Sequence, residues 1–139
     1  MNEPKSRPSI RIYFCRNAVG SSAPPVELAE ASWRDDAVIE ALPCSGKIDP
    51  RYMLKAFEGG GKAIAVLTCA SGHCKHMEGN LRALRRVLAV REYLIEAGLN
   101  PHSAQVFIPD GPTPEELNAA VRRLKAFIER QLAEDGVKA

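Results

Sequence analysis

The sequence predicts an α/β fold with helices on both faces of a parallel sheet, and three observations support this prediction. Four short runs rich in aliphatic and aromatic residues are spaced along the 139 residues. Turn-forming residues separate these runs, and segments with a helical apolar period follow them. Because consecutive parallel strands need a connection that recrosses the sheet, the helical segments are expected to be right-handed crossovers.

Each predicted strand is a short apolar run that ends where regular structure is broken. The strands are expected at residues 9–14, 37–42, 63–68 and 104–108. The third run, AIAVLT, is apolar almost throughout, as in a parallel strand that is buried on both faces. Proline and glycine follow the second and fourth runs and end those strands.

The first two predicted helices are short. Turn residues at 20–25 lead into a helical stretch around residues 26–32. Asp49 and Pro50 are the residue types expected at an N-cap and at the first helical position. Glycines at 59–61 end the helix that these two residues begin.

The last two predicted helices are long and amphipathic. From about residue 78 to residue 97 the apolar residues recur near the helical period, and Gly98 follows them. Thr113 and Glu116 have the types and spacing of a capping box, which starts the final helix. The apolar face of that helix consists of Leu117, Val121, Leu124, Ile128 and Leu132.

These elements predict one three-layer α/β domain over residues 1–139, with a four-stranded parallel sheet that is flavodoxin-like in outline. A chain of this length can bury a sufficient core without disulfides or a structural metal. The ends, at residues 1–8 and 134–139, are expected to be flexible.

The composition disfavours several classes of protein. A net charge of +2 and an aromatic content of 6% do not fit nucleic-acid binding. No apolar run approaches the roughly 20 residues of a membrane-spanning helix, and the first nine residues lack the apolar stretch of a signal peptide. We therefore expect a cytoplasmic protein. In that reducing compartment, four cysteines indicate metal ligation or thiol chemistry rather than disulfides.

The four cysteines are expected to gather at one edge of the sheet. Cys15, Cys44 and Cys69 each follow a predicted strand, and Cys74 lies five residues after Cys69. The carboxyl ends of parallel strands meet at one edge, about 4.8 Å apart, so these four thiolates are predicted metal ligands. Thiolates select zinc or iron–sulfur clusters. A single close pair fits a [2Fe-2S] cluster better than zinc, whose sites usually contain two close pairs.

The same residues allow other interpretations. Four unrelated buried cysteines would be expected inside helices as well, and none is there. A phosphatase-type thiol loop needs an arginine six residues after Cys15, where Ser21 stands. His73 and His76 could replace cysteines as ligands, as histidines do in Rieske centres. Basic residues beside the cysteine loop could dock an acidic partner or offset the cluster charge: Lys75, His76, Arg82, Arg85 and Arg86.

Several motifs occur in order along most of the chain: Phe14-Cys15, Cys44-Ser45-Gly46-Lys47-Ile48, Leu54-Lys55-Ala56-Phe57, Cys69 with Gly72-His73-Cys74, and Gly79-Asn80 with Arg85-Arg86. This order resembles the delta subunit of methyl-viologen-reducing hydrogenase. The resemblance implies an electron-transfer subunit with one [2Fe-2S] cluster, held by Cys15, Cys44, Cys69 and Cys74. Its partners would be a donor subunit such as hydrogenase and a heterodisulfide-reductase A-like flavoprotein, in cytoplasmic and often flavin-bifurcating complexes.

One feature departs from the family pattern. The family has further cysteines after the first one, and Arg16 and Val19 stand at those positions in this chain. A second hypothesis, from another functional class, is a zinc-binding or metal-free docking subunit of an oxidoreductase complex. The third is an enzyme that uses Cys15 as a nucleophile.

Overall fold

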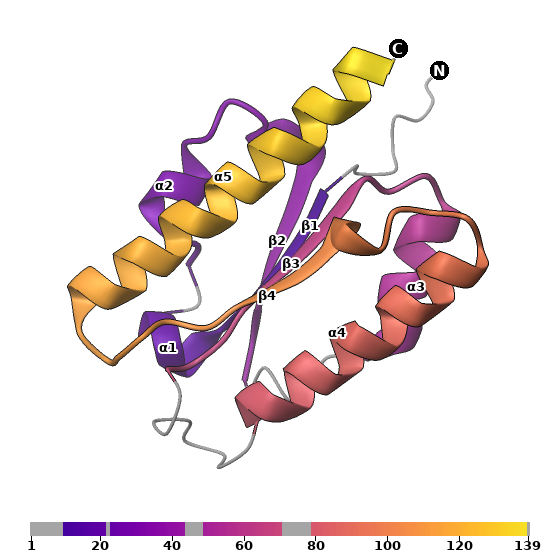
Figure 1. Cartoon of the computed structure of the whole chain (residues 1–139). Helices are drawn as coiled ribbons and strands as arrows, with labels where there is room; N and C mark the ends of the chain where they lie inside the picture. The colour runs from indigo at the N-terminus through magenta and orange to yellow at the C-terminus, as the bar shows by residue number, and fades with distance from the viewer. Residues whose placement is uncertain (1–9, 22, 44–48, 71–78, 139) are drawn as a thin grey trace.

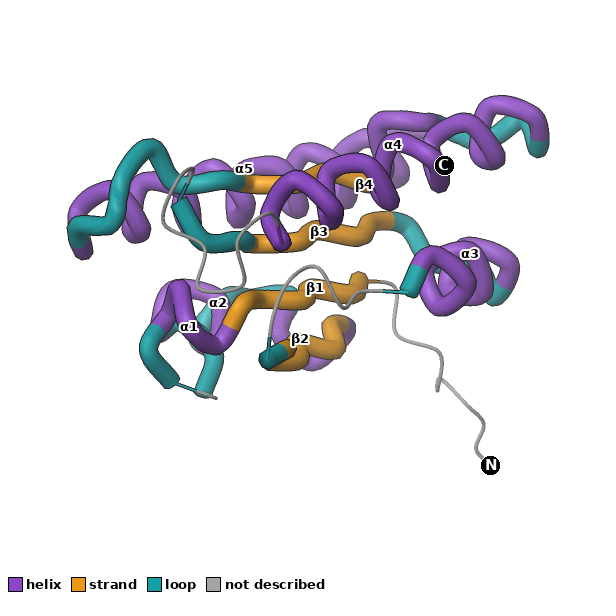
Figure 2. Tube along the Cα trace, turned by 90° about the horizontal axis from the view of Figure 1, so that it is seen from below, coloured by secondary structure: helices purple, strands orange, loops and turns teal. Residues whose placement is uncertain are grey.

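The computed structural model describes residues 10–21, 23–43, 49–70 and 79–138. Within these ranges one parallel sheet has four strands in the order β2-β1-β3-β4. The strands are β1 (Ile10–Cys15), β2 (Ala37–Leu42), β3 (Ala63–Leu67) and β4 (Ala104–Phe107). Figure 2 shows them side by side, with β2 and β4 at the two edges. This order is that of flavodoxin-like sheets, so the predicted fold class is confirmed.

Helices cover both faces of the sheet, which gives three layers (Figure 1). One face carries α1 (Arg16–Val19), α2 (Val26–Ala29) and α5 (Pro114–Lys138). The other face carries α3 (Pro50–Glu58) and α4 (Gly79–Glu96). Short 3-10 turns precede β2 at Arg34–Asp36 and β4 at Pro101–Ser103. Within the described ranges, no helix combines the length and the apolar character needed to cross a membrane.

Two apolar cores lie on the two faces of the sheet. Ile12 and Phe14 of β1 are buried on the α5 face, whereas Tyr13 is buried on the α3 and α4 face. This alternation is the two-residue period of a strand. All five residues of β3 are buried, as expected for a strand covered on both sides. The predicted apolar stripe of α5 faces the first core, where Val121, Leu124 and Ile128 are buried and Leu117 and Leu132 are partly buried.

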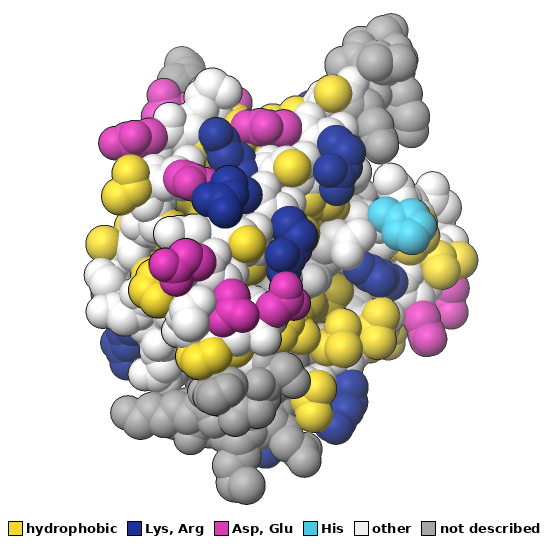
Figure 3. All heavy atoms as spheres, turned by 60° about the vertical axis from the view of Figure 1, so that its left-hand side comes forward, with side chains coloured by type: hydrophobic (Ala, Val, Ile, Leu, Met, Phe, Trp, Pro, Cys, Tyr) yellow, Lys and Arg dark blue, Asp and Glu magenta, His cyan; other side chains and the backbone are white. Residues whose placement is uncertain are grey.

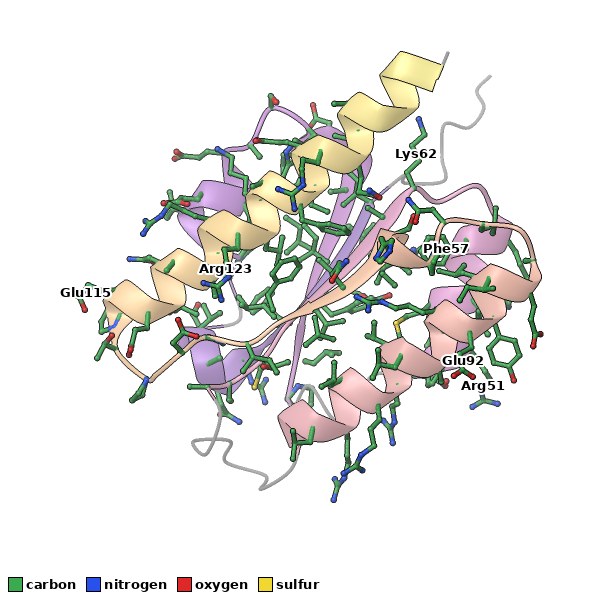
Figure 4. All side chains as sticks on the ribbon, in the orientation of Figure 1. Arg51, Phe57, Lys62, Glu92, Glu115 and Arg123 are labelled. Carbon is green, nitrogen blue, oxygen red and sulfur yellow. The ribbon has the colours of Figure 1, made fainter. Side chains whose placement is uncertain are left out.

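The outer edge of β4 is protected by an arginine from each flanking helix. The Nε of Arg91 on α4 donates to the Ala104 carbonyl oxygen over 2.8 Å. Arg123, which projects from α5 (Figure 4), donates through Nη2 to the Ile108 carbonyl oxygen over 3.4 Å. Burial lowers the pKa of the Arg91 guanidinium from its ordinary value. Charged side chains of this kind make an edge strand unavailable for pairing with another chain.

The predicted ends of the elements need small corrections. β1 extends to Cys15, which pairs with Leu42, so Cys15 is the last strand residue rather than the first loop residue. β3 and β4 each end one residue earlier than expected, and α2 ends at Ala29 rather than at residue 32. The turn of α1 was not predicted. Residues 1–8 and the side chains of residues 134–139 lie outside the described residues.

The capping box at the start of α5 is confirmed. The Thr113 amide donates to Glu116 Oε1 over 3.3 Å, and the Glu116 amide donates to Thr113 Oγ1 over 3.2 Å. Thr113→Ala is expected to lower the free energy of unfolding by about 1 kcal/mol, because the Glu116 amide loses its acceptor and the Glu116 carboxylate loses the Thr113 hydroxyl as a donor. Urea unfolding measures this difference. Thr113→Ser keeps the hydroxyl and should unfold like the unmodified chain; equal losses in both variants would contradict the prediction.

The N-cap of α3 is also confirmed. Asp49 accepts a hydrogen bond from the Arg51 amide over 2.9 Å and from its guanidinium over 3.1 and 3.3 Å. The Arg51 guanidinium is the main cause that holds the pKa of the Asp49 carboxyl below its ordinary value.

Arg51→Ala is expected to raise the pKa of Asp49 toward its ordinary value, because the charged form loses its guanidinium partner. An NMR titration of the Asp49 carboxyl measures this pKa. Since a lowered folded-state pKa stabilises the fold above the unfolded-state pKa, this contribution is lost as the pH falls through the folded-state pKa. Arg51→Lys should retain part of the shift. An Asp49 pKa that is the same with and without Arg51 would contradict this assignment.

Candidate metal centre

Two of the four predicted ligands lie together at the carboxyl edge of the sheet. Cys15 ends β1, and Cys69 comes two residues after the end of β3, its neighbour in the sheet. Their Sγ atoms are 3.3 Å apart. Both side chains are buried, with Cys15 1% and Cys69 5% exposed. The sheet therefore brings together two thiols that are 54 residues apart in the sequence.

This position is the topological switch point of the sheet. The chain leaves β1 toward α1 and α2 on one face, whereas it leaves β3 toward α4 on the other (Figure 1). Doubly wound folds bind ligands at such a switch point, outside the carboxyl ends of the strands where the connections diverge. Cys15 and Cys69 stand at this point. The sequence predicted the edge, but the strand order that makes these two cysteines neighbours came from the structure.

The distance between the two sulfur atoms suits shared ligation. A disulfide bond would hold them at about 2.05 Å. Two thiolates on one tetrahedral metal ion, each about 2.3 Å from it, would be about 3.8 Å apart. The observed 3.3 Å is closer to the second value. A small movement of either side chain would therefore let both thiolates hold one metal ion or one cluster.

The other predicted site residues lie outside the described residues. These are Cys44, His73, Cys74, Lys75 and His76, together with Ser45, Gly46, Ser71 and Gly72, whose amides were expected to donate to the sulfurs. Accordingly, the described ranges contain no group of three or more metal-ligating side chains. The assignment of all four cysteines as ligands stays a prediction.

Two polar side chains that the sequence did not reveal fix the backbone around the cysteine pair. Asn17 of α1 donates through Nδ2 to the Pro43 carbonyl oxygen over 3.2 Å, and Pro43 immediately precedes Cys44. The buried Thr68 hydroxyl donates to the Cys69 carbonyl oxygen over 2.9 Å. The Asn17 contact has no local sequence signal, because it joins residues 26 positions apart whose proximity depends on where β1 and β2 end in space.

A cavity of about 310 Å³ opens beside Cys69. It lies between α1, the loop after β4 and the start of α5, and the residues around it are Asn17, Ala18, Ala70, Pro109, Gly111, Pro112 and Leu117. Cys69 lines the cavity, whereas Cys15 does not. Because Cys15 is buried and the cavity does not reach it, this geometry disfavours Cys15 as the nucleophile of an enzyme.

The basic residues at the start of α4 lie on its outer side. Arg82 and Arg85 are exposed, and Arg86 is half-buried and contributes to the low pKa of Asp49. Figure 3 shows instead the side of the molecule that carries α2 and α5, where basic and acidic side chains are intermixed. The suggested role of these arginines in docking a partner or offsetting cluster charge stays a prediction.

Comparison with known proteins identifies the family. The family pattern described as methyl-viologen-reducing hydrogenase, delta subunit, matches residues 10–131. The chain belongs to this family. The match covers both described cysteines, every strand and most of α5, which confirms the resemblance seen in the sequence motifs.

Relatives of this delta-subunit chain have names of two kinds. The D-type iron-sulfur subunit of the vhu F420-non-reducing hydrogenase of Methanocaldococcus jannaschii is 33% identical over 92 residues, which are 66% of this chain and 69% of the relative. The D-type iron-sulfur subunit of the F420-non-reducing hydrogenase of Archaeoglobus profundus is 26% identical over 127 residues, 86% of this chain and 93% of the relative. The A-type subunit of the ferredoxin:CoB-CoM heterodisulfide reductase of Methanosarcina mazei is 34% identical over 58 residues, 42% of this chain but 7% of that much longer protein.

Proposed function

We propose that this delta-subunit chain is an electron-transfer subunit that carries one [2Fe-2S] cluster. The observation that carries the proposal is the buried pair of Cys15 and Cys69, with Sγ atoms 3.3 Å apart at the switch point of the sheet. Relatives over much of the chain are named iron-sulfur subunits of hydrogenases, which supports iron rather than zinc.

The chemistry of the two thiols fits such a group. Thiolates are soft ligands that iron–sulfur clusters and zinc prefer, and hard cations are excluded. When bound, the cluster would supply a one-electron carrier whose potential depends on burial and on hydrogen bonds to its sulfurs. Cys15 and Cys69 would hold it, together with Cys44 and Cys74. Burial of the pair keeps water away, and the Thr68 hydroxyl fixes the Cys69 backbone.

The proposed partners are a donor subunit, such as a hydrogenase, and a heterodisulfide-reductase A-like flavoprotein. One relative, the A-type subunit of a heterodisulfide reductase, contains a segment similar to this chain. In that protein the similar segment and the rest of the reductase share one chain, which holds them close together. We infer that the separate chain reaches the same neighbour by docking. Thiolate ligands persist in a reducing compartment, so we place the complex in the cytoplasm.

Anaerobic purification of the full chain tests the proposal. A [2Fe-2S] protein should be brown, should contain iron and acid-labile sulfide in equal amounts, and should lose visible absorption on reduction. A colourless chain that contains zinc would support a zinc-binding docking subunit, since the same pair of sulfurs also suits tetrahedral zinc. A chain that binds neither metal after reconstitution with iron and sulfide would support the remaining hypothesis, a metal-free docking subunit.

A further inference from the structure

We propose that, in the metal-free chain, Cys69 and Cys15 form a thiol–disulfide exchange site that accepts small disulfides through the cavity beside Cys69. This reaction goes beyond electron transfer by a bound cluster, because it uses the two thiols themselves as a two-electron couple. Three observations carry it: the 3.3 Å between the sulfur atoms, the cavity that reaches only one of them, and the difference in their burial.

The cavity determines which molecules reach the pair. Its volume of about 310 Å³ admits a small aliphatic disulfide. Among the described residues that line it, the side chains are apolar or small apart from the amide side chain of Asn17. The class of substrate is therefore a small aliphatic disulfide.

The two thiols have separate roles in this reaction, because the cavity reaches only one of them. Cys69 lines the cavity and is the thiol that an incoming disulfide meets first. Cys15 is 1% exposed, does not line the cavity, and lies 3.3 Å from the Cys69 sulfur. To form a disulfide at about 2.05 Å, the two sulfur atoms need to approach by only about 1.2 Å from their 3.3 Å separation. Cys15 is thus placed to attack a group that Cys69 has already captured.

The exchange proceeds in two balanced steps. The Cys69 thiolate attacks one sulfur of the disulfide RSSR, so that a Cys69–SR bond forms, the S–S bond of RSSR breaks, and one RS⁻ leaves. The Cys15 thiolate then attacks the Cys69 sulfur and displaces the second RS⁻. The two thiol protons of the protein end on two RSH molecules. The cysteine pair loses two electrons, and RSSR gains them.

Peptide mapping of the full metal-free chain tests this reaction, with 2-hydroxyethyl disulfide as the probe. The expected product is one disulfide between the Cys15 and Cys69 peptides. Cys15→Ser should stop the reaction at a mixed disulfide on Cys69, whereas Cys69→Ser should leave Cys15 unlabelled. A faster link between Cys69 and Cys44 or Cys74, or labelling of Cys15 in the Cys69→Ser variant, would overturn the proposal.

A cavity-filling variant tests the route. Ala18→Phe places a ring in the cavity and should slow capture of the probe by Cys69 at least about tenfold, because thiol reactivity depends on access. Ala29→Phe is the matched control at an exposed position of α2, outside the cavity lining, and should react at the original rate. Circular dichroism checks that both variants fold. Equal rates in the two variants would overturn entry through the cavity.

The proposed exchange reaction and the proposed cluster can be refuted independently of each other. The exchange is measured on the metal-free chain, and the cluster is measured as bound iron and sulfide. A chain that forms the Cys15–Cys69 disulfide but binds no iron overturns only the proposed function. A chain that binds the cluster but forms no such disulfide when stripped of metal overturns only the exchange site.

Discussion

Replacing Cys15 or Cys69 with serine is expected to reduce the iron retained by the purified chain at least about tenfold. Each substitution removes one of two buried thiols that lie 3.3 Å apart. A serine hydroxyl is a harder and less acidic ligand, and soft thiolates are what an iron–sulfur cluster requires. Iron and sulfide content, together with visible absorption after anaerobic reconstitution, measure the loss.

Ala70→Ser is the matched control for these two variants. It adds a hydroxyl beside Cys69 in the same buried segment but keeps every sulfur atom, so iron content should stay near that of the unmodified chain. Cys44→Ser and Cys74→Ser extend the test to the two predicted ligands outside the described residues, and both should also lose the cluster. Full iron content in the Cys15→Ser and Cys69→Ser variants would refute the site.

Local sequence signals located most of the regular structure. β2 has the predicted bounds, because its apolar run is closed by Pro43. Asp49 and Thr113 cap α3 and α5 as predicted, since a cap is recognised by a side chain within a few residues. The single turn of α1 was missed because Arg16–Val19 has no apolar period. It depends instead on Gly20, whose φ of 81° suits glycine, and on the long-range contact between Asn17 and Pro43.

The candidate site depends on long-range contacts that local sequence signals do not predict. The positions of Cys15 and Cys69 near strand ends predicted their edge of the sheet. Their contact required knowing that β1 pairs with β3 as well as with β2, and such pairing depends on the whole core rather than on neighbouring residues. The cavity is less predictable still, because Asn17, Cys69 and Leu117 come from three distant parts of the chain.

Replacing Phe14 with alanine is expected to lower the free energy of unfolding by about 3–5 kcal/mol. Phe14 is fully buried on β1, in the same cluster as Leu124 and Ile128 of α5. The substitution removes the ring from the contact between sheet and helix, and the backbone of β1 cannot move in to fill the space because it pairs with β2 and β3. For a chain of 139 residues this corresponds to a fall in Tm of about 10–17 °C.

The size of this effect follows from the burial of Phe14. The exposed residue Val26 provides the control, as the variant Val26→Ala. Val26 is 66% exposed on α2, so removing its two methyl groups should change stability by less than about 0.5 kcal/mol. Thermal unfolding of both metal-free variants, followed by circular dichroism, gives the comparison without any contribution from a bound cluster. A Phe14→Ala chain that melts within a few degrees of the Val26→Ala chain would mean that β1 and α5 do not pack through this ring.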